Sequence, residues 1–245
     1  MALLLLHGFT HTGASWAPVR AMLPERYRAL APDLRGHGSA GAAQPVTLDA
    51  VLGDLAALAP PEGLTLAGYS MGGRIALHAA LSAPFAGRIQ RLVLIGASPG
   101  LADPAERAAR RAADERLADE IERLGREGAG IAEFARRWAT STPVLAGQPA
   151  EVLELIHQDR LRNTPAGLAR ALRGLGTGAL PSLWERLGEG QLPVTLVVGE
   201  RDEKFTAIAE QMAARLPDAR LEVVPGVGHA VHLEAPARVA ALLAE

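Results

Sequence analysis

The chain has 245 residues, 49% of them apolar, and its 25 basic and 27 acidic side chains leave a formal net charge of −2. Because the charges nearly balance, the protein has no overall positive potential that would attract nucleic acid. No apolar run approaches the roughly 18 residues that a membrane span needs. The absence of cysteine excludes disulfides and thiol nucleophiles, so we expect a soluble cytoplasmic protein with no nucleic-acid or membrane partner and no metal or other cofactor.

Short apolar runs alternate with longer helical patterns and predict the strands of a sheet. The runs are apolar throughout and are separated by segments long enough for crossover connections, which is typical of parallel strands covered on both faces. We therefore predict an α/β fold with a doubly wound, mostly parallel sheet. The predicted strands are residues 3–6, 27–31, 64–67, 92–95, 194–198 and 221–224.

Helical signals replace this alternation between the fourth and fifth predicted strands. Asp103 is a helix N-cap followed by Pro104, and a glycine at 125 or 128 ends that helix. Thr164 and Pro165 begin another helix. We predict a helical cap over residues 101–185, inserted between core segments 1–100 and 186–245, above the edge of the sheet where ligands bind in open α/β folds.

Ser70 lies in Gly-Tyr-Ser-Met-Gly at 68–72, directly after a predicted strand and before a predicted helix. In this context a G-x-S-x-G sequence exposes a strained serine nucleophile at the top of an α/β sheet. The glycines are needed because side chains there would meet the neighbouring helix and strand. A serine hydroxyl reacts only when an imidazole accepts its proton and a carboxylate orients that imidazole.

The two partners are found after the last two predicted strands. Asp202 ends the segment Gly-Glu-Arg-Asp at 199–202, and His229 ends Gly-Val-Gly-His at 226–229. The chain order Ser, Asp, His is that of the α/β-hydrolases. Phe9 follows the first strand and Met71 follows the serine, so their N–H groups are the predicted oxyanion hole.

The motifs HGF, DLRGHG, GYSMGG, GERD and GHAVH follow one another along the chain, which resembles the α/β-hydrolase superfamily. His7 and His37 are interpreted as structural residues of their loops. Members of the superfamily usually begin with a β-hairpin, whereas His7 here follows only six residues. We therefore expect a sheet without those first two strands. The edge of the sheet that their absence exposes could be covered by dimerisation, so the chain is expected to be a monomer or a homodimer.

A finer resemblance is to the 2-succinyl-6-hydroxy-2,4-cyclohexadiene-1-carboxylate synthases of menaquinone biosynthesis. It implies a lyase that eliminates pyruvate from 2-succinyl-5-enolpyruvyl-6-hydroxy-3-cyclohexene-1-carboxylate, with the serine of the triad as the base and the oxyanion hole stabilising an enolate. The motifs are GYSMGGR at 68–74, SPGL at 98–101, ERxxRRxxDxxLA at 106–118, FxxxW at 134–138, GLAxxLRGxGTG at 167–178 and DEKF at 202–205.

The resemblance also implies a small-molecule substrate with three carboxylates, which arginine side chains would bind as bidentate pairs. One position that carries an arginine in this family aligns with Glu115 here, so two nearby arginines are its possible substitutes. For the cap arginines, a helix face exposed to solvent is an equally good interpretation. Trp184 is interpreted as part of the core of the cap. The implied substrate-binding residues are Tyr69, Arg74, Trp138 and Lys204, then Arg110 or Arg111 as the substitutes, and Arg160 with Arg162 as its alternative.

Two other functions remain open on the sequence. A carboxylesterase or C–C bond hydrolase would use the same triad, with Ser70 as an acylated nucleophile. A non-catalytic binding module could also be built on this fold. The presence of Ser70, Asp202 and His229 together counts against a binding module, because a receptor has no need of all three.

Overall fold

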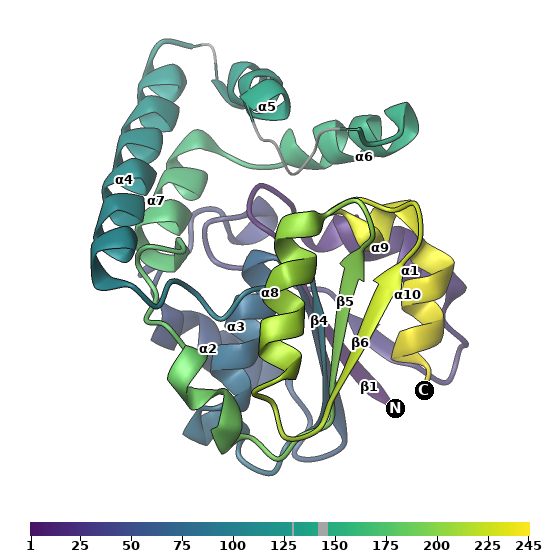
Figure 1. Cartoon of the computed structure of the whole chain (residues 1–245). Helices are drawn as coiled ribbons and strands as arrows, with labels where there is room; N and C mark the ends of the chain where they lie inside the picture. Colours follow the sequence, from purple (N-terminus) through teal and green to yellow (C-terminus); the bar gives the residue numbers. More distant parts are fainter. Residues whose placement is uncertain (129, 142–146) are drawn as a thin grey trace.

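The computed structural model describes residues 1–128, 130–141 and 147–245. All of the predicted strands are present, in one six-stranded sheet of order β2-β1-β3-β4-β5-β6 (Figure 1). Each pair of neighbouring strands is parallel, as expected for a sheet without the two antiparallel strands. The strands are β1 (Ala2–Leu6), β2 (Arg28–Leu30), β3 (Leu64–Tyr69), β4 (Ile89–Ile95), β5 (Val194–Gly199) and β6 (Ala219–Val224).

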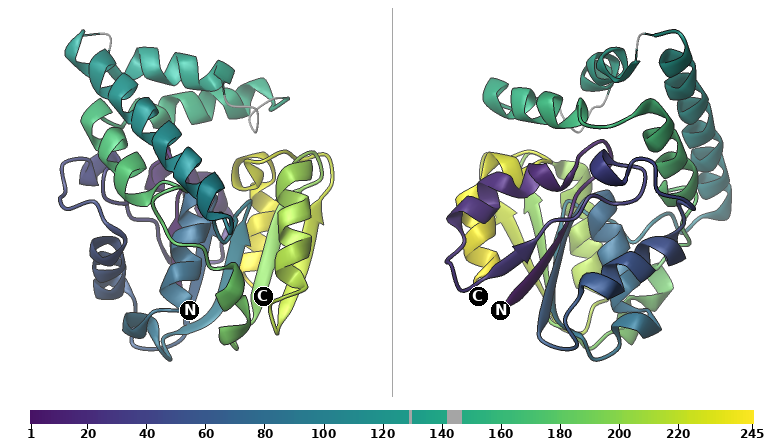
Figure 2. Two further views of the ribbon diagram at one scale, coloured as in Figure 1. Left: turned by 60° about the vertical axis from the view of Figure 1, so that its left-hand side comes forward. Right: turned by 180° about the vertical axis from the view of Figure 1, so that it is seen from behind.

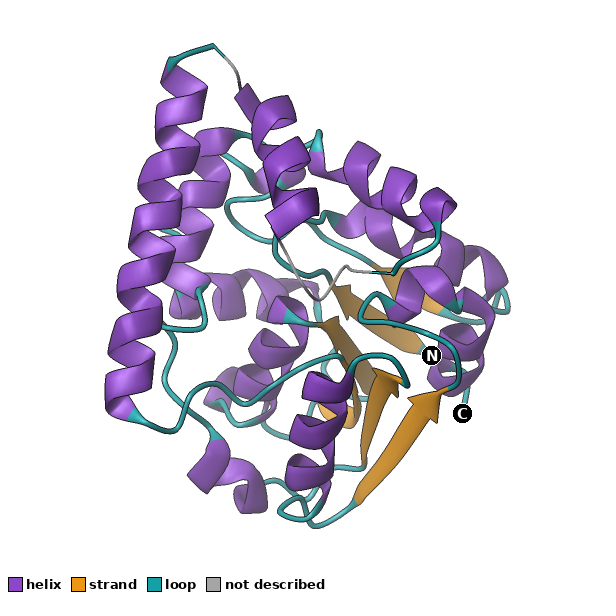
Figure 3. Cartoon of the chain, turned by 45° about the horizontal axis from the view of Figure 1, so that its top comes forward, coloured by secondary structure: helices purple, strands orange, loops and turns teal. Residues whose placement is uncertain are grey.

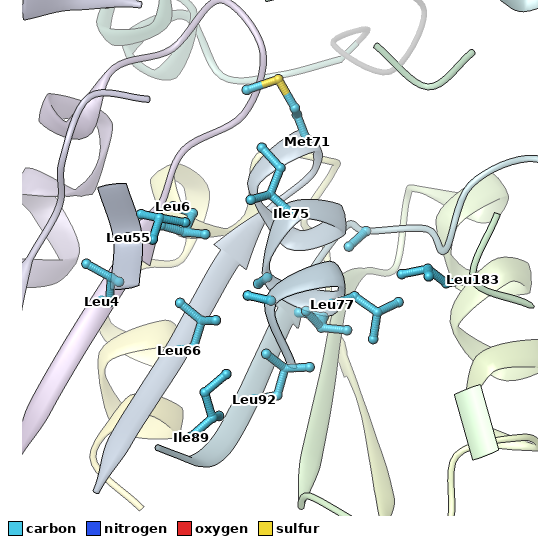
Figure 4. Close-up of a cluster of buried hydrophobic side chains, with 14 of the residues drawn as sticks. Leu4, Leu6, Leu55, Leu66, Met71, Ile75, Leu77, Ile89, Leu92 and Leu183 are labelled. Atoms are coloured by element: carbon cyan, nitrogen blue, oxygen red, sulfur yellow. The ribbon is translucent and has the colours of Figure 1, made fainter. Parts of the chain in front are cut away.

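The inner strands are mostly apolar because helices cover both faces of the sheet. Leu4 and Leu6 of β1 belong to the buried cluster under α2, α3 and α8, shown in Figure 4, whereas Leu3 and Leu5 belong to the cluster under α1, α9 and α10. Successive side chains of a strand point to opposite faces, so a strand between two helical layers needs no polar face. The core helices are α1 (Ala17–Met22), α2 (Leu48–Leu58), α3 (Met71–Ala80), α8 (Glu203–Ala213), α9 (Val231–Glu234) and α10 (Pro236–Leu243).

The two edge strands are less buried than their apolar sequences indicate. Leu30 of β2 is 50% exposed and Val223 of β6 is 40% exposed. An edge strand has a neighbour on one side only, so part of its surface meets solvent whatever its composition. Whether a second copy of the chain covers either edge stays a prediction.

The described residues between β4 and β5 include four α-helices, which lie above the carboxyl ends of the strands (Figures 2 and 3). They are α4 (Pro104–Arg126), α5 (Gly130–Ser141), α6 (Ala150–Arg160) and α7 (Pro165–Leu175). The predicted N-cap of α4 is confirmed, since the Asp103 carboxylate accepts hydrogen bonds from the N–H groups of Ala105 (2.7 Å) and Glu106 (2.8 Å). Apolar side chains of α4, α5 and α7 form a small separate core, whereas the buried apolar residues of α6 belong to a cluster of the sheet.

Short 3-10 helices complete the described chain: η1 (Gly13–Trp16), η2 (Gly38–Ala40), η3 (Ala83–Phe85) and η5 (Trp184–Glu189). Thr164 caps α7 as predicted, its hydroxyl accepting from the Gly167 N–H over 3.1 Å. None of the helices in the described ranges is both long and apolar enough to cross a bilayer.

The turn between β3 and α3 holds Ser70 in a strained conformation, with φ of +52°. Glycine is required on both sides of it. A Cβ atom on Gly68 would lie 2.3 Å from the Gly72 carbonyl oxygen, and one on Gly72 would lie 2.3 Å from the carbonyl oxygen of Leu6. The helix therefore packs its backbone directly on its own strand and on β1, which fixes the place of the serine.

This packing predicts opposite effects for two helical glycines. Gly72→Ala should lower the free energy of unfolding by about 3 kcal/mol, because its methyl group meets a backbone oxygen that cannot yield. Gly53→Ala in α2 is the matched control: no atom lies within 4 Å of its Cβ position, so it should stabilise the protein by about 1 kcal/mol. Urea unfolding of both variants measures this, and equal effects would contradict the packing argument.

Candidate active site

A cavity of about 390 Å³ lies between the cap helices and the carboxyl ends of the strands. Most of the predicted site residues line it, although they come from separate parts of the sequence. Because parallel strands end at the same edge, the loops after them converge there. The predicted residues that line the cavity are Phe9, Tyr69, Ser70, Met71, Arg74, Arg110, Trp138, Arg160, Lys204 and His229.

Asp202 and His229 form a buried hydrogen-bonded pair. Oδ2 of Asp202 lies 2.6 Å from Nδ1 of His229, and both residues are buried. The other carboxylate oxygen accepts from the N–H of Phe205 over 3.4 Å, so Asp202 also caps α8. This second bond holds the carboxylate in place while it orients the imidazole, and it leaves Nε2 of His229 as the nitrogen available for proton transfer.

The imidazole of His229 is held by close packing as well as by its carboxylate partner. Its ring centroid lies 4.5 Å from that of Phe205 and 5.2 Å from that of Tyr69. Gly96 follows β4 with φ of +53°, and a Cβ atom there would lie 2.9 Å from Cε1 of His229. Ser70 and His229 line the same cavity, so the hydroxyl and the imidazole border a common space.

Phe9 and Met71 both belong to segments that adjoin Ser70, since a Cβ atom on Gly8 would lie 3.5 Å from Cβ of Ser70. Met71 is the first residue of α3, where backbone N–H groups have no partner within the helix and the helix dipole favours negative charge. Phe9 belongs to the loop after β1, which lies against the Tyr69 ring so closely that a Cβ atom on Gly8 would be 2.8 Å from it. Both residues line the cavity.

Arg74 is buried under the cap without an acidic partner in the described chain. Its guanidinium donates to the hydroxyl of Thr177 (2.9 Å) and to the Leu175 carbonyl oxygen (3.2 Å), while Nε has no partner. Burial, with a smaller effect from Arg110, lowers the pKa of Arg74 to about 10, so it remains charged at neutral pH. A buried, charged guanidinium in a cavity is a site for an anionic group.

Arg160 is a second buried cation that the cavity wall contains. It is 1% exposed, and its Nε donates to the Thr10 hydroxyl over 3.2 Å. Burial lowers its pKa to about 10, which again leaves it charged at neutral pH. Arg110 differs, because it is half-exposed and its Nε binds Asp114 over 2.7 Å; its charge is already partly neutralised.

Two predicted arginines are not among the residues lining this cavity. Arg111 is exposed on α4, and Arg162 is 63% exposed and lines a second, surface pocket. Glu115, which stands at a family arginine position, pairs with Arg173 over 2.7 Å. Trp184 is partly buried and donates to the Gly100 carbonyl oxygen over 3.1 Å; it packs against the main core of the sheet and not, as expected from the sequence, against that of the cap.

The remaining predicted contacts form the aromatic and cationic sides of the cavity. Tyr69 is 3% exposed, and burial raises the pKa of its hydroxyl, so the hydroxyl stays protonated. Trp138 packs edge-on against Phe9, with ring centroids 5.6 Å apart. Lys204 is exposed and lies over the Phe205 ring at 5.8 Å, at the solvent side of the site.

Several residues at or near the cavity were not singled out in the sequence. His11 lines it, and Asp159 and Asn163 contact the loop that contains Phe9. These are common polar residues in segments without a diagnostic spacing. Asp159 and Asn163 lie close in the sequence to Arg160, which was a predicted site residue; this was the one indication that their segment reaches the site.

His7 has the structural role expected of it. Its Nε2 accepts from the Leu34 N–H over 2.9 Å, so the ring proton lies on Nδ1, which donates to the Gly8 carbonyl oxygen over 2.9 Å. The neutral ring thereby joins the loops after β1 and β2. His37 packs edge-on against it, with centroids 4.9 Å apart.

Comparisons with known proteins agree with the observed fold. The profile of the Alpha/beta hydrolase family matches residues 3–242. A Bacillus subtilis (strain 168) protein, named provisionally as a 2-succinyl-6-hydroxy-2,4-cyclohexadiene-1-carboxylate synthase, is 39% identical over 96% of this chain and 86% of its own length. MenH from S. aureus superposes with a TM-score of 0.89 at 31% identity, over 100% of this chain and 92% of that one. A malate-bound esterase from Thermogutta terrifontis gives 0.80 at 30% identity, over 100% and 88%.

The buried histidines predict that acid destabilises the protein. Burial lowers the pKa of His7 to about 4 from an ordinary value of 6.5, so the unfolded chain takes up this proton first as the pH falls. Stability from His7 is therefore present above pH 6.5 and is lost between 6.5 and 4, by about 2 kcal/mol at pH 4.5. Urea unfolding at pH 7 and 4.5 measures the loss, and His7→Gln should show a smaller one; an unchanged loss in that variant would contradict the assignment.

Proposed function

The chain belongs to the alpha/beta hydrolase family, and we propose that it is a lyase of menaquinone biosynthesis. It eliminates pyruvate from 2-succinyl-5-enolpyruvyl-6-hydroxy-3-cyclohexene-1-carboxylate and releases 2-succinyl-6-hydroxy-2,4-cyclohexadiene-1-carboxylate. The observation that carries the proposal is one cavity that contains Ser70 and His229 together with Arg74 and Arg160, two buried arginines without ion pairs in the described chain. The sequence similarity to synthases that bear this product's name supports the same choice.

The proton relay begins at the carboxylate of Asp202, which orients His229 so that its Nε2 can accept the proton of Ser70. The Ser70 oxygen then takes the proton on the carbon next to the succinyl ketone. The electrons of that C–H bond move to the ketone oxygen, and the resulting enolate is stabilised by the N–H groups of Phe9 and Met71. As the enolate collapses to the ketone, double bonds form between ring carbons 2 and 3 and between 4 and 5 in place of the one between 3 and 4, and the bond from carbon 5 to the enolpyruvyl oxygen breaks. The leaving group departs as the enolate of pyruvate and becomes pyruvate by taking up the proton held by His229, and no acyl-enzyme forms.

Recognition of the substrate follows from charge. Three carboxylates entering a site from which water is excluded lose their hydration, and guanidinium groups replace it with paired hydrogen bonds. We assign this role to Arg74 and Arg160, with Arg110 and Lys204 at the more exposed side. Arg111 and Arg162 are the less favoured choices because both lie outside the cavity wall.

The cap helices have a second part in the proposal, because they separate the site from solvent. α4, α5, α6 and α7 each contribute a side chain or more to the cavity wall. The boundaries 101–185 for the cap, the cytoplasmic location and the choice between monomer and homodimer stay predictions from the sequence.

A carboxylesterase is the second candidate, favoured by the structural similarity to the Thermogutta terrifontis esterase. It would use the same residues with Ser70 attacking a carbonyl carbon. The two functions differ in one intermediate, since an esterase forms an acyl-serine and the proposed lyase forms none.

Removing the hydroxyl of Ser70 tests the proposed base. The wild-type protein should release pyruvate from the enolpyruvyl substrate, and Ser70→Ala should lower kcat by more than about 10³-fold, as triad removals do elsewhere. Far-UV circular dichroism and the unfolding midpoint of the variant control for folding. Failure of the pure wild-type protein to release pyruvate would end the proposal, and a stoichiometric burst of p-nitrophenol from p-nitrophenyl esters would favour the esterase.

Arg74 tests the recognition of carboxylates. Arg74→Ala should lower kcat/KM for pyruvate release by roughly 10- to 100-fold, the effect of losing one guanidinium–carboxylate pair. Arg74→Lys should be intermediate, because an ammonium retains the charge without the bidentate geometry. Arg116→Ala is the matched control, since Arg116 is exposed on α4; an Arg74→Ala variant with the same kcat/KM as this control would contradict the assignment.

A further inference from the structure

The loop after β1 contains a strained residue directly after Phe9. The His11 N–H donates to the Gly8 carbonyl oxygen over 3.2 Å, so Gly8, Phe9, Thr10 and His11 form a β-turn. Thr10 has φ of +69°, a value that glycine or asparagine normally supplies in such turns. A β-branched residue keeps this conformation only where its surroundings hold it there.

One set of contacts that hold Thr10 in this conformation comes from Asn163, which follows α6. The Asn163 side-chain N–H donates to the Thr10 carbonyl oxygen over 2.8 Å and to that of Arg160 over 3.2 Å. Its carbonyl oxygen accepts from the Gly38 N–H over 3.0 Å. Asn163 is 4% exposed, so a single buried amide joins the cap, the loop after β1 and the loop after β2.

A buried carboxylate holds the other end of the turn. Asp159 of α6 accepts from the Thr12 N–H over 2.8 Å and from the Thr12 hydroxyl, and it lies 3.3 Å from Nδ1 of His11. Burial favours the neutral form of Asp159, but the nearby imidazole of His11 and the hydrogen bonds from Thr12 outweigh it and lower the pKa of the carboxyl group. The carboxylate therefore stays ionised and keeps accepting both bonds at neutral pH.

We propose that Asn163 and Asp159 are positioning residues that hold the Gly8–His11 turn so that the Phe9 N–H faces the developing oxyanion. The inference rests on the proposed function, which assigns that N–H to the enolate. Neither residue is among those lining the cavity, so both act through the backbone of the turn. A donor aimed at charge that appears only in the transition state affects kcat more than KM.

Asn163→Ala should lower kcat for pyruvate release by on the order of 10- to 100-fold with KM changed less than about 3-fold. Asn163→Asp keeps the acceptor for Gly38 but removes the donor to Thr10, so it tests the turn with less disturbance of packing. Gln158→Ala is the matched control, because Gln158 is exposed on α6 and binds only Glu154 in the described chain, over 2.7 Å. Equal kcat values for Asn163→Ala and this control would overturn the proposal.

Measuring Asn163→Ala in a protein that already carries Thr10→Gly distinguishes a positioning role of Asn163 from a general contribution to stability. Glycine adopts positive φ without strain, so the loss in kcat caused by Asn163→Ala should be several-fold smaller when Thr10→Gly is already present. A purely structural role for Asn163 gives the same loss in both backgrounds, and that result would overturn the proposal.

Hydrogen exchange gives a readout that does not depend on the reaction. Amides of residues 8–12 should exchange at least about 10-fold faster in Asn163→Ala than in Gln158→Ala, because the turn opens more often. Faster exchange in a protein that releases no pyruvate would mean that the proposed function alone has failed. Pyruvate release with unchanged exchange and unchanged kcat in Asn163→Ala would mean that the positioning inference alone has failed.

Discussion

The contact between the backbone of α3 and that of β1 is the constraint on which the site depends. Gly72 lies against the Leu6 carbonyl oxygen at a distance that no side chain could share. Because the helix cannot move outward without losing this contact, the residue before it must turn sharply, and Ser70 takes its positive φ. The strain is held by packing in the best-buried part of the molecule, which is where a rigid nucleophile or base has to be attached.

The second constraint is electrostatic. Burying Arg74 and Arg160 without carboxylate partners costs stability, and the lowered pKa of each records that cost. By contrast, Arg173, which is partly exposed, pairs with three acidic residues at once. Charges that the fold leaves uncompensated in a cavity are most simply explained by a ligand that compensates them, which is why the proposed substrate is an anion.

Much of the core and part of the site could be predicted from the sequence for physical reasons. An inner parallel strand is apolar on both faces, so its position is written in a short run of residues, and loops after such strands must meet at one edge. The degree of burial of edge strands could not be predicted, because it depends on neighbours along the sheet. The sequence favoured Arg160 over Arg162 only through its distance from a motif, and it could not show that these two residues, two positions apart, face different surroundings. Asn163 was missed because its importance comes from a strained partner about 150 positions away.

The order of segments along the chain has an evolutionary consequence. The proposed proton relay comes entirely from the sheet segments, whereas the arginine of α6 comes from the insertion between β4 and β5. Exchange of that insertion could therefore redirect a descendant enzyme to a different molecule while its reactive residues stayed as they are. The amide of Asn163 limits this freedom, because a transplanted lid would also have to supply a group that grips the Thr10 carbonyl oxygen.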